Sequence, residues 1–113
     1  MQTALICASH SPLLYCYDKP PVEWDAIQAA YANARTFAEE FDPELVVIFG
    51  ADHFNGFFLN LMPAFCIGLS AQATDDIGGF SGTLDVPEDM AMDCINYLRT
   101  HDIDTASSYQ MTV

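Results

Sequence analysis

The sequence predicts an α/β fold in which a layered sheet carries flanking helices. Two observations support this class. Short apolar runs of strand length alternate with two longer segments in which apolar residues recur every three or four positions. The stretches between successive apolar runs are also long enough for parallel strand pairing. Strands and helices that alternate in this way form helical layers over a sheet.

The first half of the chain predicts a strand, a helix and a second strand. Residues 3–8 (TALICA) form an apolar run that fits a buried strand, and a proline-containing stretch ends it. From Val22 to Phe41 the period is helical, with apolar positions at Ile27, Tyr31, Ala34, Ala38 and Phe41. Acidic residues near its start suit a helix N-terminus. Residues 44–50 (ELVVIFG) read as a strand covered on both faces.

The second half predicts a strand, a loop, a helix and the start of another strand. Residues 64–73 form the strand, and the glycine- and serine-rich residues 75–83 form a surface loop. The helix starts at Pro87, has acidic residues in its first turn, and is marked by Met90, Cys94 and Leu98. Residues 104–113 begin the last strand. We find no repeat, low-complexity tract or linker, so we expect one domain over residues 1–113.

Charge and composition exclude several classes of protein. Hydrophobic residues make up 51% of the chain and charged residues 17%, which argues against disorder. Sixteen acidic residues face three basic ones, for a net charge of −13. Such a chain repels phosphate backbones, so we expect no nucleic-acid partner. The acidity favours solubility, and an alternative is that its field concentrates cations.

The sequence also predicts a cytoplasmic protein without a membrane partner. The longest apolar stretches fall short of the roughly 20 residues that span a bilayer, and the first residues do not resemble a signal peptide. No cysteine pair has C-x-x-C spacing. We therefore expect the cysteines to be small core residues, without disulfides or zinc. Those in apolar surroundings are Cys7, Cys66 and Cys94.

Two histidines directly follow predicted strands. His10 follows the first apolar run and His53 follows residues 44–50. Functional groups of open α/β sheets gather beyond the carboxyl ends of the strands, so the two imidazoles could meet there and bind a metal. The alternative is that each is an ordinary hydrogen-bonded loop residue. His101 ends an acidic helix, and we expect it to be structural or exposed.

Three segments carry a resemblance to a known family. Residues 9–13 (SHSPL), 43–58 (PELVVIFGADHFNGFF) and 62–69 (MPAFCIGL) are similar, in this order, to the N-terminal part of class III extradiol dioxygenases. The resemblance implies a partial domain of that fold. It also implies a non-haem Fe(II) cofactor held by His10 and His53, with a catechol and O2 as substrates. Around these ligands we expect orienting or pocket residues at Ser9, Ser11, Asp52, Phe54, Asn55 and Phe57, with Phe58 as a further aromatic wall. The alternative for the three phenylalanines is core packing, which we favour for at least two of them.

The chain departs from the family pattern where the remaining site residues should follow. The carboxylate ligand and the acid–base histidines of the family have no counterpart in residues 1–113, so the catalytic acid–base residue is unknown. We therefore expect an N-terminal portion that is inactive alone and exposes apolar sheet surface, which favours a homo-oligomer. The alternative is a truncated, non-catalytic relative that serves as a binding or assembly module.

The implied substrate is a 3-substituted catechol such as 2,3-dihydroxyphenylpropionate. We expect its side-chain carboxylate to pair with a basic side chain, and the basic residues of the chain are Lys19, Arg35 and Arg99. Lys19, in the loop after His10, is the best placed of the three in sequence, although a solvated loop lysine is the simpler interpretation.

Overall fold

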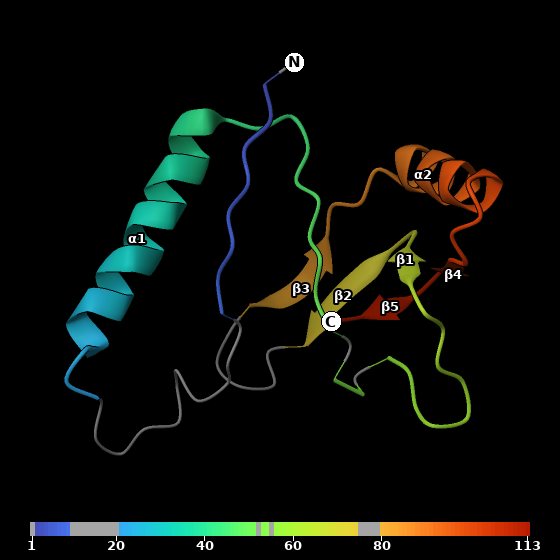
Figure 1. The fold of residues 1–113 in the computed structure, drawn as a ribbon, viewed down its shortest axis with the longest axis horizontal. Helices are drawn as coiled ribbons and strands as arrows, with labels where there is room; N and C mark the ends of the chain where they lie inside the picture. Colours follow the sequence, from blue (N-terminus) through green and yellow to red (C-terminus); the bar gives the residue numbers. More distant parts are fainter. Residues whose placement is uncertain (1, 10–20, 52, 55, 75–79) are drawn as a thin grey trace. The chain divides into compact units, whose positions relative to one another are not determined.

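The chain folds into separate helical and sheet elements of a mixed α/β protein (Figure 1). The computed structural model describes residues 2–9, 21–51, 53–54, 56–74 and 80–113. It divides into two compact units, Met1–Phe49 and Gly50–Val113, which are described separately. The elements are α1 (Trp24–Phe41), β1 (Cys66–Gly68), β2 (Ala71–Thr74), β3 (Ser81–Leu84), α2 (Glu88–Thr100), β4 (Ala106–Ser108) and β5 (Met111–Thr112). The predicted α/β class is confirmed.

Helix α1 confirms the helical period of the first unit. Its half-buried residues are Trp24, Ile27, Tyr31, Ala34, Ala38 and Phe41, which include every position of the predicted apolar stripe. Asp25 lies in the first turn, and Asp42 ends the helix in a left-handed conformation while its N–H bonds the Ala38 carbonyl. No α1 side chain is fully buried. The stripe is therefore only partly covered in this unit.

The strands predicted over residues 3–8 and 44–50 are not formed in the described part of the chain. Residues 2–9 and 44–50 have no strand assignment and appear as plain tubes in Figure 1. The predictions were wrong because a strand also needs neighbouring strands to bond its backbone, and an apolar sequence does not provide them.

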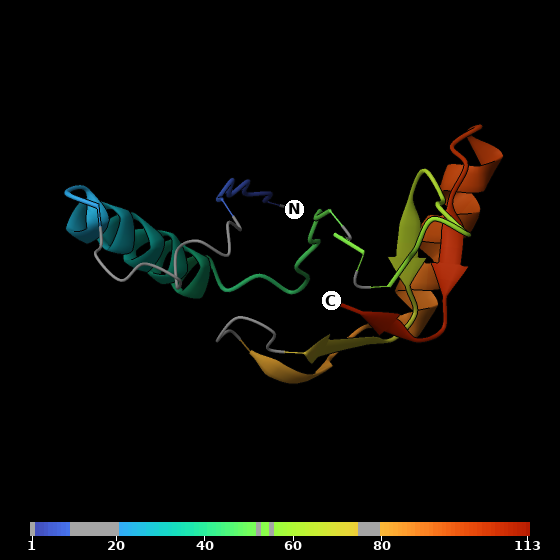
Figure 2. The same ribbon diagram turned by 90° about the horizontal axis from the view of Figure 1, so that it is seen from below.

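The second unit contains two small sheets. In the first, β1 pairs in parallel with β4, and α2 contacts β1 (Figure 2). In the second, β2 lies between β3 and β5, antiparallel to β3 and parallel to β5. The predicted parallel pairing is confirmed for two of these pairs. The antiparallel β2–β3 pair was not predicted.

Two predicted strands are each divided in two. Residues 64–73 form β1 and part of β2, and residues 104–113 form β4 and β5. Leu69 donates its N–H to the Ser108 carbonyl at 2.7 Å, and Met111 donates to the Ser70 carbonyl at 3.0 Å. These bonds connect the two sheets at the break. The predicted loop over 75–83 was wrong at its end, because β3 begins at Ser81, while residues 75–79 lie outside the described residues.

The core of the second unit centres on α2. Ile95 is fully buried, and Leu69 and Thr105 are 3% and 2% exposed. The predicted helix is confirmed over Glu88–Thr100, with Pro87 as its N-cap. Its predicted inner face is confirmed only at Leu98, which is half-buried, because Met90 is 52% exposed and the fully buried residue is Ile95.

The cysteine prediction was also wrong in part. Cys7 and Cys94 are exposed thiols, and Cys66 is half-buried. Cys94 lies beside the buried Ile95 on α2, and adjacent helix positions point in different directions. Apolar neighbours in sequence are therefore not a sufficient sign of burial.

Among the helices that the structure describes, none is long and apolar enough to cross a membrane.

Candidate functional site

His53 lies in a turn of unusual backbone conformation at the start of the second unit. His53 and Phe54 both have positive φ angles, 49° and 64°. Two successive positive φ values are typical of type I′ turns, which favour glycine and asparagine. A histidine and a phenylalanine are strained in this conformation, and such strain concentrates at functional sites.

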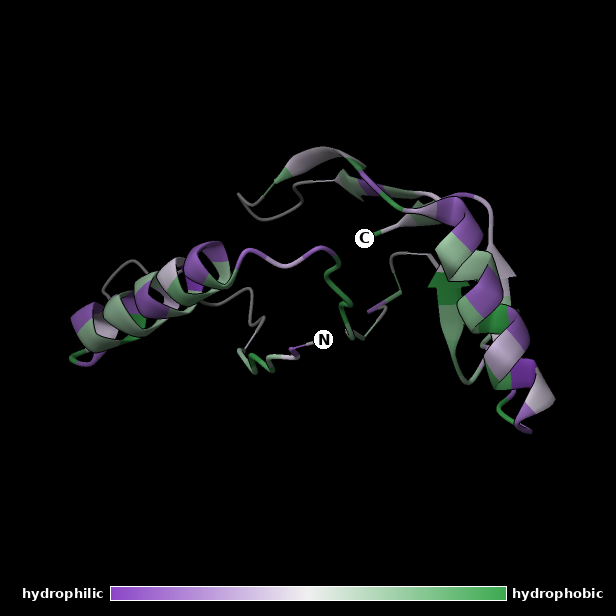
Figure 3. Cartoon of the chain, turned by 90° about the horizontal axis from the view of Figure 1, so that it is seen from above, coloured by the Kyte–Doolittle hydropathy of each residue, from purple (hydrophilic) through white to green (hydrophobic). Residues whose placement is uncertain are grey.

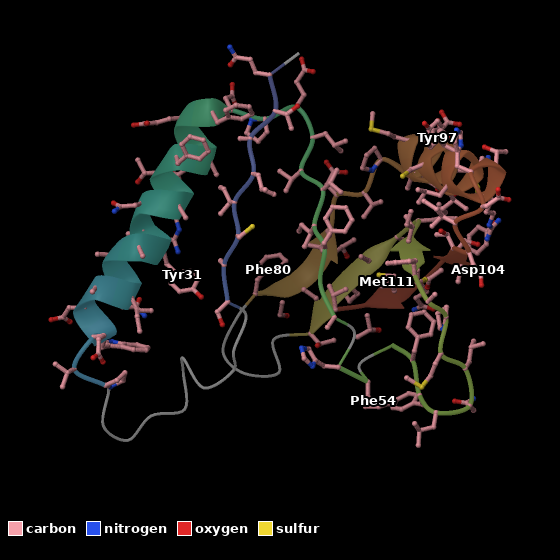
Figure 4. The ribbon with its side chains drawn as sticks, in the orientation of Figure 1. Tyr31, Phe54, Phe80, Tyr97, Asp104 and Met111 are labelled. Atoms are coloured by element: carbon pink, nitrogen blue, oxygen red, sulfur yellow. The ribbon has the colours of Figure 1, made fainter. Side chains whose placement is uncertain are left out.

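The same turn forms part of a pocket. A pocket of about 320 Å³ is lined by His53, Phe54, Phe57, Met62 and Pro63. Phe57 is half-buried, and Phe54 is 52% exposed (Figure 4). The walls are mostly apolar, and the histidine places an imidazole among them. Its size lies near the lower end for small-molecule sites, so it suits a single aromatic ring.

A second turn completes the pocket. Leu61 donates its N–H to the Phe58 carbonyl at 2.9 Å, which reverses the chain before Met62. Met62 and Pro63 therefore reach the pocket wall. Neither residue was predicted from the sequence to line a pocket. Asn60, a common turn residue between apolar neighbours, was the signal that could have revealed the reversal.

Not every predicted wall residue lines the pocket. Phe54 and Phe57 do so, and their role at a substrate site stays a prediction. Phe58 is 59% exposed and is absent from the lining, so its predicted role as a wall was wrong for this pocket. Its carbonyl instead closes the turn to Leu61.

The other predicted site residues are placed only in part. Ser9 belongs to the first unit, where its carbonyl accepts a hydrogen bond from the Tyr31 hydroxyl of α1 (Figure 4). His53 belongs to the second unit. His10, Ser11, Asp52 and Asn55 lie outside the described residues, so their predicted roles stay predictions.

Metal-binding side chains do not form a cluster within the described ranges. In that part of the chain no three His, Cys, Asp or Glu side chains come together to hold a metal. Among the described residues that line the pocket, His53 is the one His, Cys, Asp or Glu side chain. Of the two predicted metal ligands, His53 lies in the described part of the chain, and its binding of a metal stays a prediction.

The described basic side chains, Arg35 and Arg99, do not line the His53 pocket. Arg99 donates from Nε to the Thr105 carbonyl at 2.9 Å, which ties the end of α2 to the start of β4. Arg35 is exposed on α1. Lys19 lies outside the described residues.

His101 has a local structural role, in agreement with its prediction. Its Nδ1 lies 2.8 Å from the Tyr97 carbonyl, and its ring stacks on Tyr97 with a centroid distance of 4.0 Å. These contacts close the C-terminal end of α2.

Comparisons with known proteins agree with the pattern of residues. The family described as "Catalytic LigB subunit of aromatic ring-opening dioxygenase" matches residues 4–113. The chain is 53% identical over 113 residues to a 2,3-dihydroxyphenylpropionate/2,3-dihydroxicinnamic acid 1,2-dioxygenase of Rhodococcus rhodochrous. Proteins of the same name from Rhodococcus globerulus and Mycolicibacterium gilvum are 47% and 51% identical.

These matches cover nearly all of this chain but only part of each relative. They include 100%, 100% and 99% of this chain but 36% of each relative, so the chain spans about a third of their length. The family match extends over both structural units and includes His53 and every residue of its pocket. The chain therefore belongs to the LigB family of aromatic ring-opening dioxygenases.

Proposed function

We propose that this chain supplies the N-terminal, metal-binding part of a non-haem Fe(II) extradiol dioxygenase that cleaves the ring of a 3-substituted catechol with O2. The observation that carries the proposal is the placement of His53 in an aromatic-walled pocket within a chain 53% identical to a catechol dioxygenase. We further infer that the two units belong to one partial catalytic domain. No feature of the described residues favours the alternative, a non-catalytic binding module.

In this proposal His10 and His53 hold the metal through neutral imidazole nitrogens. Asp52 and Asn55 flank His53 in sequence, and Ser9 and Ser11 flank His10, so these polar groups can orient the two rings. When bound by these residues, Fe(II) would supply the Lewis acidity that lowers the pKa of the diol.

The aromatic side chains position the substrate. Phe54 and Phe57 offer flat apolar surfaces to the catechol ring, and they exclude water from one side of it. A ring held against these walls presents its hydroxyl pair toward His53. Orientation of this kind lowers the barrier because the reacting groups need no further alignment.

Two further parts of the reaction belong to polypeptide outside residues 1–113. A carboxylate ligand would complete the facial triad, and a base would accept the catechol proton. The relatives have ample further length for both, because this chain matches 36% of the Rhodococcus rhodochrous protein. Residues 1–113 alone should therefore show no appreciable ring cleavage.

The substrate proposed is a catechol with a carboxylate-bearing side chain, such as 2,3-dihydroxyphenylpropionate. The names of the relatives support this class. Arg99 is a poor partner for the carboxylate, because it does not line the His53 pocket. Lys19 or a group outside residues 1–113 is the better candidate.

We also propose that residues 1–113 associate into homo-oligomers when isolated. Large apolar side chains are exposed in both units, and Phe49 and Leu59 are 93% and 83% accessible. Apolar surface of this extent favours association.

A chimera tests the proposed function directly. The matched third of the Rhodococcus rhodochrous relative is replaced by residues 1–113, and the product is loaded with Fe(II) without oxygen. After air is admitted, we expect 2,3-dihydroxyphenylpropionate to give a yellow ring-opened product, followed by absorbance. An inactive but folded chimera would refute the proposal.

Two histidine variants of the chimera locate the site. His53→Ala should abolish product formation, because it removes a metal ligand. His101→Ala is the matched control and should retain activity, because its contacts are confined to the end of α2. Equal activity of the two variants would exclude His53 from the site.

A further inference from the structure

The Tyr31 side chain of helix α1 bonds the N-terminal segment of the first unit. Its hydroxyl donates a hydrogen bond to the Ser9 carbonyl, which lies 22 residues away in the sequence. Tyr31 belongs to the half-buried stripe of α1, a helix along which hydrophobic and hydrophilic residues alternate (Figure 3). Its ring points from the helix toward the N-terminal segment (Figure 4). The bond therefore joins a helix to a segment that has no secondary structure of its own.

Residues 2–8 are weakly held within the first unit. Their side chains are all exposed, and Leu5 and Ile6 are 86% and 45% accessible. In the described part of the chain, residues 2–8 make no hydrogen bond through their backbone. The N-terminal segment is thus fixed at its end, at Ser9, rather than along its length.

The bonded carbonyl is part of the peptide group that joins Ser9 to His10. A peptide group is planar, so the carbonyl oxygen of one residue lies in one plane with the nitrogen and Cα of the next. A hydrogen bond to this oxygen limits the rotation of that plane. Holding the Ser9 carbonyl therefore restrains the backbone from which the His10 side chain starts.

Tyr31 is well suited to hold this peptide group. It lies near the middle of the 18-residue helix α1, away from the ends, where helices fray. A tyrosine has only two side-chain dihedral angles, so its hydroxyl is a more rigid donor than the end of a lysine or arginine side chain. The hydrogen bond is also exposed, and water replaces an exposed bond at little cost to stability. The bond thus contributes more to the position of Ser9 than to folding.

We propose that Tyr31 is a positioning residue that orients the proposed metal ligand His10 through the Ser9 carbonyl. The inference rests on the proposed function, because it takes His10 as a ligand. A ligand held in place before the metal arrives loses less conformational freedom on binding, so the metal is bound more tightly.

The size of the effect follows from how Tyr31 acts. Groups that bond a ligand directly contribute about 10–100-fold to metal affinity. Tyr31 acts through one peptide group, so its hydroxyl should contribute about five- to tenfold, near the lower end of that range.

Three variants of the chimera with the Rhodococcus rhodochrous relative separate the hydroxyl from the ring. Tyr31→Phe removes the donor and keeps the ring. Tyr31→4-aminophenylalanine restores an N–H donor at the same place. Tyr109→Phe is the matched control, because it removes a hydroxyl from a 70% exposed residue whose bond to Ser70 uses the backbone carbonyl. Circular dichroism checks that all three are folded.

Metal affinity tests whether the bond positions a ligand. Co(II) is the probe, because it binds a given set of nitrogen and oxygen ligands more tightly than Fe(II) does. In calorimetric titration, Tyr31→Phe should raise the dissociation constant about five- to tenfold. Tyr31→4-aminophenylalanine should recover most of this loss, and Tyr109→Phe should show none. Equal affinity of Tyr31→Phe and the unchanged chimera would overturn the inference and leave the proposed function in place, whereas an unchanged chimera that binds no Co(II) would overturn both.

Carbon-13 NMR measures the hydrogen bond itself, without metal, in isolated residues 1–113. The carbonyl signal of Ser9 should move in Tyr31→Phe, return toward its original position in Tyr31→4-aminophenylalanine and stay in place in Tyr109→Phe. This readout does not depend on the proposed function. An unchanged Ser9 signal in Tyr31→Phe would show that the hydroxyl does not hold this peptide group, and it would overturn the inference whatever the metal affinity.

Discussion

The turn at His53 and Phe54 combines local strain with a place in the pocket. Non-glycine residues with positive φ cost about 1–2 kcal/mol each relative to the right-handed region. Both side chains line the pocket, so a better turn residue at either position would change the pocket wall. Strain at this position fits a site in which the side chains matter more than stability.

Phe54→Asn should show how much the positive φ of Phe54 costs in stability, separately from the place of its side chain in the pocket. Asparagine tolerates positive φ well, and Phe54 is already 52% exposed, so little apolar burial is lost. We expect the free energy of unfolding to rise by up to about 1 kcal/mol in urea denaturation. Phe58→Asn is the control, because Phe58 is 59% exposed without a positive φ, and it should give no increase. A loss of stability in Phe54→Asn larger than that in the control would contradict the strain argument.

Metal affinity tests the two proposed ligands in residues 1–113 themselves. His10→Ala or His53→Ala should reduce binding of Fe(II) to background, because two ligands already form an incomplete site. Anaerobic calorimetric titration measures this, and His101→Ala should bind like the wild type. Unchanged affinity in the His10→Ala/His53→Ala double variant would remove both residues from the metal site.

At the scale of elements, the break between β1 and β2 brings β5 close to the end of β1. A Cβ added at Gly68 would lie 3.0 Å from the Met111 Cβ, 3.1 Å from its Sδ and 3.1 Å from the Ser70 carbonyl. Glycine is therefore required by close packing between neighbouring elements.

Gly68→Ala should destabilise the second unit by about 1–3 kcal/mol, because the added methyl group overpacks this contact. Gly50→Ala is the matched control, since its Cβ would meet nothing within 4 Å. Both are measured by urea unfolding followed by circular dichroism. Adding Met111→Ala, which removes Sδ and keeps Cβ, should recover part of the loss, and a purely additive double variant would show that Sδ is not the obstacle.

Helix α2 attaches to its sheet mainly through Ile95. This side chain is fully buried, so Ile95→Ala should lower the free energy of unfolding by about 2–5 kcal/mol. Ile95→Val, at about 0.5–1.5 kcal/mol, keeps the test informative if the alanine variant does not fold. Met90→Ala, on a 52% exposed side chain, should change stability by less than about 0.5 kcal/mol. Equal effects at the two positions would contradict the assigned inner face.

At the scale of the whole molecule, apolar exposure and acidity oppose each other. Exposed apolar side chains favour association of isolated residues 1–113, whereas the net charge of −13 disfavours it. Salt weakens only the second effect, because the Debye length is about 10 Å at 0.1 M and shorter above it.

Self-association should therefore increase with salt. Sedimentation velocity at about 0.05 M and about 0.5 M NaCl should show a larger share of oligomers at the higher concentration. NaCl screens charge with little effect on apolar burial. A larger share of oligomers at high NaCl would therefore identify charge repulsion as the force that opposes association. A compact monomer at both concentrations would contradict the predicted homo-oligomer.

The sequence by itself determined the features that depend on local pattern. The period of apolar residues predicted α1 and its half-buried stripe, and Pro87 with its acidic neighbours predicted the start of α2. Phe54 and Phe57, which lie near His53 in the sequence, line a pocket with it, and the functional role of that pocket stays a prediction. These features are local because hydrogen bonds and side-chain spacing within a few residues decide them.

Only the tertiary structure decided the features that need a distant partner. Residues 3–8 and 44–50 have strand composition, yet they form no strand in the described part of the chain, because pairing requires backbone groups from elsewhere. Met62 and Pro63 enter the pocket only through the turn at Phe58–Leu61. Ile95, rather than Cys94, faces inward because contact with the sheet selects one face of α2. Burial depends on which surfaces meet, and the order of residues along a single element does not specify that.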